Sequence, residues 1–176
     1  MLRNYLGSWL LLATLLVTGV IACGGGGQSS SENTEAQPTR NRSTHPGPKP
    51  THPAEVSTGT PIPTTILVNE YGFALYSDGN DAKDSGQSSC YGACERQWRP
   101  YLTAGQPVPW QGKEAVAKNL LGTIQRSDGT EQVTYDGYPL YLLKGEATAK
   151  ANGIGRSSFG ATWFAVEPDG SRLGHL

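Results

Sequence analysis

Two cysteines four residues apart are the side chains whose type and spacing most clearly suggest chemistry. Cys90 and Cys94 lie in the segment SSCYGACERQW, residues 88–98, and the chain has 3 cysteines in all. Such a pair can form a disulfide, bind a soft metal ion or act as a reactive dithiol. Haem attachment is excluded, because it requires Cys-x-x-Cys-His and this sequence is Cys-x-x-x-Cys-Glu.

Histidine is absent from the region around these cysteines. The 3 histidines are His45, His52 and His175, two in a polar N-terminal stretch and one next to the last residue. Ser-His-Asp and Cys-His nucleophilic sites, and the common zinc and copper sites, need an imidazole held in place. We therefore predict that the protein is not an enzyme, and we assign no cofactor and no metal site. The formal net charge of -1 also argues against nucleic acid as a partner.

The third cysteine, Cys23, follows a short apolar segment. Arg3 precedes the run WLLLATLLVTGVIA, which has the length of a signal peptide and is too short for a spanning helix. The last residues, Val20-Ile21-Ala22-Cys23, resemble the bacterial lipobox. That resemblance implies that residues 1–22 are a lipoprotein signal peptide and that Cys23 is diacylated, with palmitate as the typical acyl chain. The alternative is an ordinary signal peptide followed by a chance cysteine.

The segment after Cys23 has the composition of a tether. It runs GGGGQSSSENTEAQPTRNRSTHPGPKPTHPAEVSTGTPIP and contains hardly an aliphatic residue before Val56. Such a segment cannot bury enough apolar surface to offset the entropy of ordering it. We predict that residues 23–63 are the lipidated cysteine and a disordered Gly/Ser/Thr/Pro tether, and that residues 64–176 are the folded domain.

The predicted domain repeats itself with a period of 65 residues. Glycine, leucine, tyrosine, an acidic residue and tryptophan recur at one ungapped offset, and upstream Val68 aligns with Val133. The motif positions are Gly72, Leu75, Tyr76, Asp81 and Trp98 in the first copy and Gly137, Leu140, Tyr141, Glu146 and Trp163 in the second. We therefore predict two repeats, about 64–102 and 129–168, joined by a connector at 103–128.

Each copy begins with a hairpin pattern. In EQVTYDGYPLYLL, apolar residues flank Asp136-Gly137, a dipeptide that suits a type I′ turn, and TILVNEYGFALYS has the same pattern around Tyr71-Gly72. A polar, glycine-rich loop follows each hairpin and precedes the tryptophan. The sequence thus predicts a mainly β fold with short helical segments, in which two tandem hairpin-based repeats pack as one small pseudo-twofold domain.

These motifs together resemble a known family. The segments Ser88-x-Cys90-x-Gly92-x-Cys94 and Arg126-x-Asp128-Gly129-x-x-Gln132-Val133-Thr134-Tyr135 are the most specific. They resemble the bacterial secreted-repeat lipoproteins described by a Tyr-x-aromatic-x-x-Asp motif, over about residues 66–168. The chain departs from that motif: Asp78 and Leu143 stand at the aromatic positions, and Glu146 replaces the second Asp. The family has no assigned activity, so the resemblance implies export and a fold.

The cysteine count favours a disulfide between Cys90 and Cys94. If Cys23 is lipidated, an even pair remains in an oxidising compartment. The second copy has Gly155 and Phe159 at the matching positions, so the repeat itself does not need sulfur. A soft copper(I) site and a redox-active dithiol remain alternatives for this pair.

Two groups of acidic residues could also form sites. Asp78, Asn80, Asp81 and Asp84 could offer oxygens to calcium, although Ala82 breaks the EF-hand order. Asp81 and Glu146, as repeat equivalents, could act as an acid–base pair of the glycosidase kind. For both residues, capping of the local loop through backbone N–H groups is the simpler interpretation.

Aromatic residues suggest a binding surface. Half-exposed tyrosine and tryptophan can stack on sugar rings or on a protein partner, and the candidates outside the repeat positions are Tyr91, Tyr101, Trp110 and Tyr138. We predict an exported cell-envelope lipoprotein held by its lipid on the cell membrane or outer membrane. Its domain would be a non-catalytic binding or structural module for a cell-wall glycan or an envelope protein. The alternative is an envelope redox or copper-handling protein that uses Cys90 and Cys94.

Overall fold

The computed structural model describes residues 49–110 and 115–176. In this part of the chain the secondary structure is almost entirely β-strand, with helix α1 (Ala93–Gln97) and the 3-10 helix η1 (Lys118–Leu120). The predicted mainly β class with short helical segments is therefore confirmed. No helix among these residues has the length and apolar character needed to cross a membrane. The predicted signal peptide and Cys23 lie outside the described residues.

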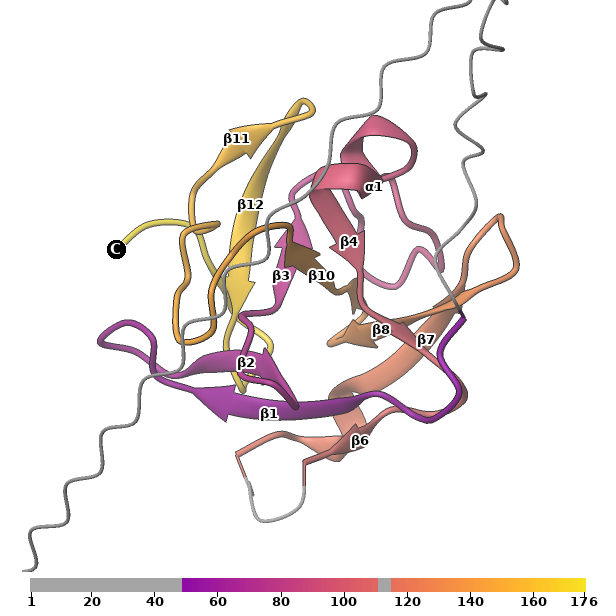
Figure 1. The fold of residues 1–176 in the computed structure, drawn as a ribbon, viewed down its shortest axis with the longest axis horizontal. Coiled ribbons are helices and arrows are strands. Elements are labelled where there is room, and N and C mark those ends of the chain that lie inside the picture. The colour runs from indigo at the N-terminus through magenta and orange to yellow at the C-terminus, as the bar shows by residue number, and fades with distance from the viewer. Residues whose placement is uncertain (1–48, 111–114) are drawn as a thin grey trace, which may run out of the picture. The chain divides into compact units, whose positions relative to one another are not determined.

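Three sheets make up the domain (Figure 1). The first has the order β2-β1-β6, the second β11-β12-β3-β10-β4 with β13 beside β12, and the third β5-β8-β7 with β9 beside β8. The strands are β1 Glu55–Gly59, β2 Ile66–Asn69, β3 Tyr76–Asp78, β4 Trp98–Pro100, β5 Leu102–Thr103, β6 Val108–Pro109, β7 Leu121–Gln125, β8 Glu131–Tyr135, β9 Tyr138–Pro139, β10 Tyr141–Leu143, β11 Ser157–Ser158, β12 Ala161–Val166 and β13 Arg172–Leu173.

Strand β1 corrects the predicted boundary of the tether. It lies inside the range 23–63, yet it pairs antiparallel with β2 and parallel with β6, and Val56 is fully buried. Local composition does not reveal this strand, because Val56 is nearly its only apolar residue and its partners lie in distant segments. The folded part therefore begins at or before Glu55.

The two predicted hairpins form with turns of different length. In the second, Tyr135 pairs with Tyr138, and Asp136 and Gly137 both have positive φ, at 47° and 78°. These values fit the predicted two-residue turn. In the first, the Asn69 N–H donates to the Phe73 carbonyl at 2.9 Å, so three residues lie in the loop.

Because the first turn has one more residue than the second, the strands before the two turns do not correspond at the 65-residue offset. Leu75 N–H donates to the carbonyl of Leu67, and Leu140 N–H donates to that of Val133. Leu67 and Val133 are both fully buried. The structural counterpart of Val133 is therefore Leu67, and the ungapped alignment of Val133 with Val68 is wrong by one residue.

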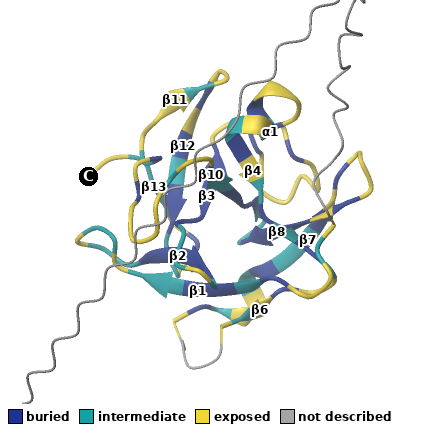
Figure 2. Ribbon diagram, in the orientation of Figure 1, coloured by how far each residue is buried: buried dark blue, intermediate teal, exposed yellow. Residues whose placement is uncertain are grey.

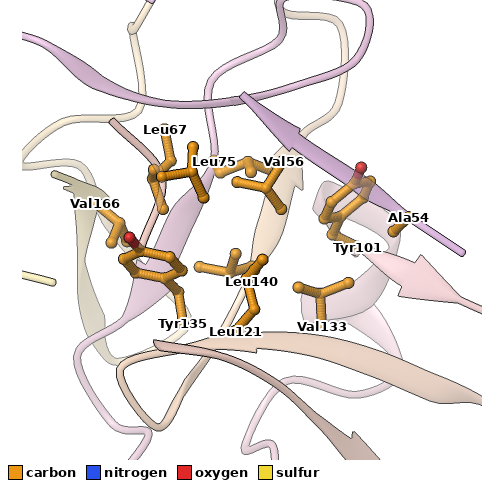
Figure 3. Packing of buried hydrophobic residues seen from close by; sticks show 11 residues of the cluster. Ala54, Val56, Leu67, Leu75, Tyr101, Leu121, Val133, Tyr135, Leu140 and Val166 are labelled. Atoms are coloured by element: carbon orange, nitrogen blue, oxygen red, sulfur yellow. The ribbon is translucent and has the colours of Figure 1, made fainter. Parts of the chain in front are cut away.

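The apolar residues form two clusters, and the loops around them are mostly exposed (Figure 2). In the first cluster, side chains from β1 and β2 point toward side chains from β7 and β8, with Leu140 between them (Figure 3). The second cluster lies on the six-stranded sheet and contains the disulfide. Its largest members are Tyr76, Trp98, Tyr141 and Trp163, all fully buried.

Candidate functional site

The centre of the six-stranded sheet brings the repeat-motif residues together. Strands β3 and β10 pair antiparallel with Tyr76 directly opposite Tyr141. On the outer sides, β3 pairs with β12 through Asp78 and Trp163, and β10 pairs with β4 through Leu143 and Trp98. These two pairings correspond to each other at the repeat offset of 65 residues. Asp78 corresponds to Leu143, and Trp98 corresponds to Trp163.

The two tryptophans stack at this centre. The ring centroids of Trp98 and Trp163 lie 3.9 Å apart with an interplanar angle of 5°. Tyr76 meets Trp98 edge-on at 5.4 Å, and Tyr141 meets Trp163 edge-on at 5.2 Å. All four rings have 0% exposure, so they form the core of the sheet and are not available to a ligand.

We call the two predicted copies, about residues 64–102 and 129–168, the first and second segments. Each tyrosine hydroxyl donates to the acidic motif residue of the other segment. Tyr76 Oη lies 2.9 Å from both carboxylate oxygens of Glu146, and Tyr141 Oη lies 2.6 Å from Asp81 Oδ2. Burial raises the pKa of both tyrosines above its ordinary value, so both hydroxyls remain protonated donors at neutral pH. Burial likewise raises the pKa of Glu146.

The same carboxylates also hold their own loops. The Ser89 N–H donates to Asp81 Oδ1 at 2.6 Å, and the Asn152 N–H donates to Glu146 Oε1 at 2.6 Å. Each carboxylate therefore joins a loop of its own segment to a tyrosine of the other segment. Because these oxygens are occupied by structural hydrogen bonds, the geometry favours the capping role over the acid–base pair considered above.

The loop after β3 and the corresponding loop after β10 place different residues beside the tyrosine hydroxyls. Ser88 Oγ lies 2.7 Å from Tyr141 Oη, whereas at the matching place the Gly153 N–H donates to Tyr76 Oη at 3.2 Å. A Cβ on Gly153 would lie 2.6 Å from Tyr76 Cε1 and 2.8 Å from Trp98 Cη2. Only glycine fits at this position without displacing the two rings.

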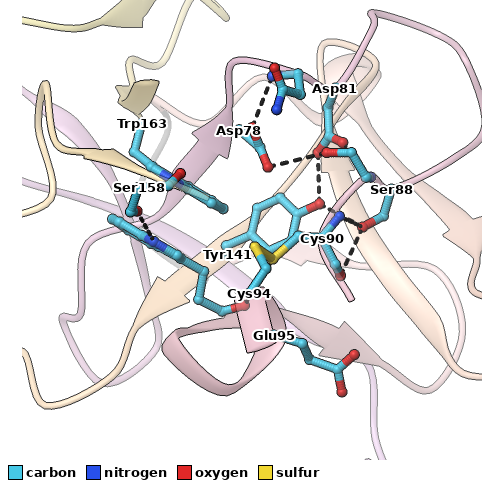
Figure 4. The surroundings of a disulfide bond; sticks show 12 residues. Asp78, Asp81, Ser88, Cys90, Cys94, Glu95, Tyr141, Ser158 and Trp163 are labelled. Carbon is cyan, nitrogen blue, oxygen red and sulfur yellow. Dashed lines mark hydrogen bonds between the residues drawn. A yellow bond between two sulfur atoms is a disulfide. The ribbon is translucent and has the colours of Figure 1, made fainter. Parts of the chain in front are cut away.

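The predicted disulfide between Cys90 and Cys94 is present. The two Cα atoms are 5.3 Å apart, and the residues are 1% and 8% exposed. Gly92, with a φ of 61°, turns the chain into α1 between the two cysteines. Figure 4 shows the bond within the buried layer that contains Tyr141.

The carboxylate of Asp78 lies beside this disulfide. One of its oxygens and the two Sγ atoms all lie within 4.8 Å of one another. Asp78 is 2% exposed, and its oxygens accept hydrogen bonds from Asn80 N–H at 2.8 Å and from Ser89 Oγ at 3.1 Å. Burial raises its pKa. At the matching position the second segment has Leu143, an apolar residue.

Arg126 fixes the disulfide loop from the other side. Its side chain has 0% exposure, and its Nη2 donates to the Cys90 carbonyl at 3.0 Å and to Glu95 at 2.9 Å. Its Nη1 donates to Ser88 Oγ at 3.0 Å and to Gln132 Oε1 at 2.7 Å. The motif Arg-x-Asp-Gly-x-x-Gln thus supplies both a buried cation and one of its acceptors.

Sequence reasoning did not predict a role for Arg126 or for Asp78 beside the sulfurs. Arg126 stands in the polar sequence QRSDGTEQ, whose composition is typical of a solvated turn. Its position in the motif that resembles the secreted-repeat family indicated that it could have a role. Of the residues considered as calcium ligands, Asp78 and Asp81 are buried and hydrogen-bonded, and Asp84 is exposed.

The candidate surface aromatics divide into two groups. Tyr91 and Trp110 are 38% and 40% exposed, as the hypothesis of a binding surface requires. Tyr101 is 6% exposed and donates its hydroxyl to the Glu55 carbonyl and to Glu70, so its assignment to the surface was wrong. Tyr138 is half-buried beneath the guanidinium of Arg172, which lies 4.2 Å from the ring centroid.

An exposed aromatic residue that sequence reasoning missed lies at the tip of the β11–β12 hairpin. Phe159 is 49% exposed and has a φ of 54°, followed by Gly160 with a φ of 77°. Beside it is a cavity of about 330 Å³ lined by Ser157, Ser158, Gly160, Ala161 and Thr162. A phenylalanine in the left-handed region is uncommon and strained, because its Cβ crowds the backbone.

Comparison with known proteins gives one match. Residues 122–167 match a family described as a secreted repeat of unknown function. This is the family that the motif segments resemble, and the matched range contains the second hairpin, Glu146 and Trp163. No curated protein and no solved structure matches the chain.

Proposed function

We propose that this protein is an exported lipoprotein, anchored to the cell envelope by a lipid on Cys23, whose β domain is a non-catalytic binding module. The lipobox-like sequence at residues 20–23 and the match to a secreted repeat support export and anchoring. One diacylated cysteine contributes about 0.8 kcal/mol of membrane affinity per buried methylene, which makes a spanning helix unnecessary.

The domain architecture in this proposal is a tandem duplication packed about a pseudo-twofold axis between Tyr76 and Tyr141. The pairing of these tyrosines with each other supports it, as do the matched pairings of β3 with β12 and of β10 with β4. Two such copies cover each other's apolar faces, so the motif residues serve the fold and any ligand must contact other residues.

The exposed ring of Phe159 is the main observation that supports a binding role. The aromatic side chain is held about half exposed at a strained backbone position, and strain of this kind concentrates at functional sites. Ser157 and Thr162 pair across the hairpin beside it and add hydroxyl groups on one face. An exposed ring next to hydroxyls suits a sugar ring, which stacks on the one and hydrogen-bonds to the others. We assign the cell-wall glycan as the ligand class.

Phe159→Asn tests the binding role. Asparagine tolerates the left-handed conformation, so the variant should be more stable by about 1 kcal/mol while losing most of its retention on cell-wall glycan in a pull-down. Tyr71→Ala is the control, since Tyr71 is 67% exposed at the tip of a different hairpin. Unchanged retention of Phe159→Asn, or turnover of the glycan by the purified protein, would refute the proposal.

Cys23→Ala tests the anchor. The variant should incorporate no label from a fatty-acid probe and should keep its signal sequence, since lipobox processing depends on that thiol. The Cys90→Ser, Cys94→Ser double variant is the control and should be labelled like the wild type. Equal labelling of Cys23→Ala and the wild type would end the anchoring proposal.

A second candidate function is redox or copper handling in the envelope through Cys90 and Cys94. The observation that favours it is Asp78, a buried carboxylate within 4.8 Å of both sulfurs. A thiol count on the protein isolated from cells separates the candidates. No free thiol on Cys90 and Cys94 supports a structural disulfide, and a mixture of oxidised and reduced chains supports the redox function.

A further inference from the structure

We infer that the disulfide loop is the closed form of a site for a thiophilic divalent cation of the zinc class. In the reduced protein the ligands would be Cys90 Sγ, Cys94 Sγ and a carboxylate oxygen of Asp78. The inference rests on one element of the second candidate function, namely that the disulfide can be reduced. It does not depend on the binding role of Phe159.

The three ligand atoms lie slightly farther apart than one bound ion allows. The three ligand atoms lie within 4.8 Å of one another. Two ligands bound to one zinc ion at about 2.0–2.3 Å can be at most about 4.6 Å apart. In the reduced protein the two sulfurs would separate by side-chain rotation, and the Asp78 carboxylate would have to approach them by about 1 Å to share a tetrahedral ion.

The carboxylate is already oriented as metal ligands usually are. Asn80 N–H and Ser89 Oγ donate to its two oxygens, at 2.8 and 3.1 Å. Hydrogen bonds of this outer kind fix the direction of a ligating group. Since Ser89 and Cys90 are neighbours in the chain, the loop that carries one sulfur also orients the carboxylate.

Two guanidinium groups offset the charge that such a site would bury. Two thiolates and one carboxylate exceed the charge of a divalent ion by one negative charge. Arg126 donates to the Cys90 carbonyl at 3.0 Å, and Arg172 Nη1 donates to the Asp78 carbonyl at 3.4 Å. A cation is thus attached to the backbone of two of the three ligand residues, which makes the buried negative charge tolerable.

The second segment shows that the fold does not require these three residues. At the matching positions it has Leu143, Gly155 and Phe159, so all three ligands are absent together. A disulfide alone would explain the two cysteines, but it leaves unexplained a buried carboxylate where the other segment has an apolar residue. A buried carboxylate costs free energy in desolvation even when it is hydrogen-bonded, and a metal ligand set gives that cost a purpose.

The redox step balances with a dithiol as the reductant. The Cys90–Cys94 bond breaks when it accepts two electrons and two protons, and the dithiol is oxidised to a disulfide. Binding of the divalent ion then releases the two thiol protons. Reoxidation by a disulfide partner removes the thiolates and releases the ion. Residues 91–93, between the two cysteines, are exposed, and we expect the reductant to approach from this side.

Zinc titration of the full chain tests the inference. The reduced protein should bind one Zn²⁺ per chain in competition with a chromophoric chelator, and the oxidised protein should bind none at Cys90 and Cys94. With Cd²⁺ as the probe, the reduced protein should show a sulfur-to-cadmium charge-transfer band, which the Cys90→Ser, Cys94→Ser double variant should lack.

Asp78→Leu and Asp78→Asn separate this site from a simple thiol pair. Leucine is the residue of the second segment at this place, so this variant is compatible with the fold. Both variants should bind Zn²⁺ at least tenfold more weakly, whereas Asp128→Asn, at an exposed turn, should bind as the wild type does. Unchanged zinc affinity in both Asp78 variants would overturn the inference, as would binding of Cu(I) alone.

Thermal unfolding gives a readout that needs no variant. Zn²⁺ should raise the unfolding midpoint of the reduced wild-type protein and leave that of the oxidised protein unchanged, because the ion binds only the folded reduced form. A reduced protein that unfolds and is not restored by Zn²⁺ would refute the site. This result would leave the glycan-binding proposal standing.

Discussion

The surroundings of Tyr141 and those of Tyr76 solve one packing problem in two ways. Both tyrosines donate to a carboxylate of the other segment and meet a tryptophan edge-on. Around Tyr141 the adjoining loop is held by polar contacts: Ser88, the disulfide and the buried Arg126. Around Tyr76 no side chain stands in the place of Ser88: Gly153 donates its backbone N–H to the hydroxyl and packs closely against the rings.

This difference shows which parts of the architecture are general. The tyrosine–carboxylate pair and the stacked tryptophans occur around both tyrosines, so they are the framework of the sheet. The disulfide, Arg126 and Asp78 occur around one tyrosine only. They are therefore additions to a framework that can form without them, and variants on the two sides should differ in how much stability they cost.

Arg126→Met should have the largest effect. It removes four hydrogen bonds from a fully buried guanidinium and leaves Gln132 Oε1 and the Cys90 carbonyl without that donor. We expect the free energy of unfolding to fall by about 4 kcal/mol in chemical denaturation. Arg172→Met is the control and should lose about 1 kcal/mol, because this guanidinium mainly stacks on half-buried rings. Equal losses in the two variants would contradict the role given to Arg126.

Gly153→Ser should come next. It places the residue found beside Tyr141 beside Tyr76, where its Cβ would lie within 2.6–2.8 Å of two ring carbons. Overpacking of this kind should lower the free energy of unfolding by about 3 kcal/mol. The reverse swap, Ser88→Gly, removes side-chain hydrogen bonds without a clash and should cost about 1 kcal/mol. If the order of the two losses is reversed, the contrast between close packing and polar contacts fails.

The Cys90→Ser, Cys94→Ser double variant should still fold. A disulfide that closes so short a loop contributes about 2 kcal/mol by restricting the unfolded chain, which corresponds to a fall of several degrees in the unfolding midpoint. The circular dichroism spectrum should be unchanged. A variant that does not fold would show that the disulfide belongs to the framework. A variant as stable as the wild type would show that the disulfide contributes nothing to stability.

Glu146→Gln should have the smallest effect, and that effect should depend on pH. Burial raises the pKa of Glu146 above 4.5, so the folded state favours the protonated acid. Its stabilising contribution is complete below the unfolded pKa and is lost as the pH rises through the folded pKa. The stability of the wild type relative to Glu146→Gln, measured in urea, should therefore fall as the pH rises above 4.5. Asp169→Asn should show the opposite trend, because hydrogen bonds from Ser171 lower the pKa of Asp169.

Several features of this fold follow from local patterns. The Asp-Gly turn and the β class were predicted because they depend on conformational preference and on alternation of apolar residues, and the disulfide because the cysteine count is even after Cys23. Strand β1 was missed because its burial depends on partners outside its own segment. The extra residue in the first turn was missed because an ungapped repeat cannot show it.

The candidate site was only partly predictable for a similar reason. Asp78 and Arg126 are charged residues in polar segments, and charged residues are rarely fully buried. Arg126 is buried against the disulfide loop, which is distant from it in the sequence, and Asp78 is buried in a strand whose partner, β12, is also distant. Tyr101 was placed on the surface because nothing in its local sequence shows that Glu70 and the Glu55 carbonyl would accept its hydroxyl.

Strand β1 has a mechanical consequence for a protein held by its N-terminus. It is the first strand after the proposed tether, and it lies between β2 and β6 in the first sheet. A pull from the anchor would load β1 along its length, so its hydrogen bonds to both neighbours would have to be sheared together instead of broken one after another. Under the proposed anchoring, the domain would be attached to its anchor through a strand that resists extraction.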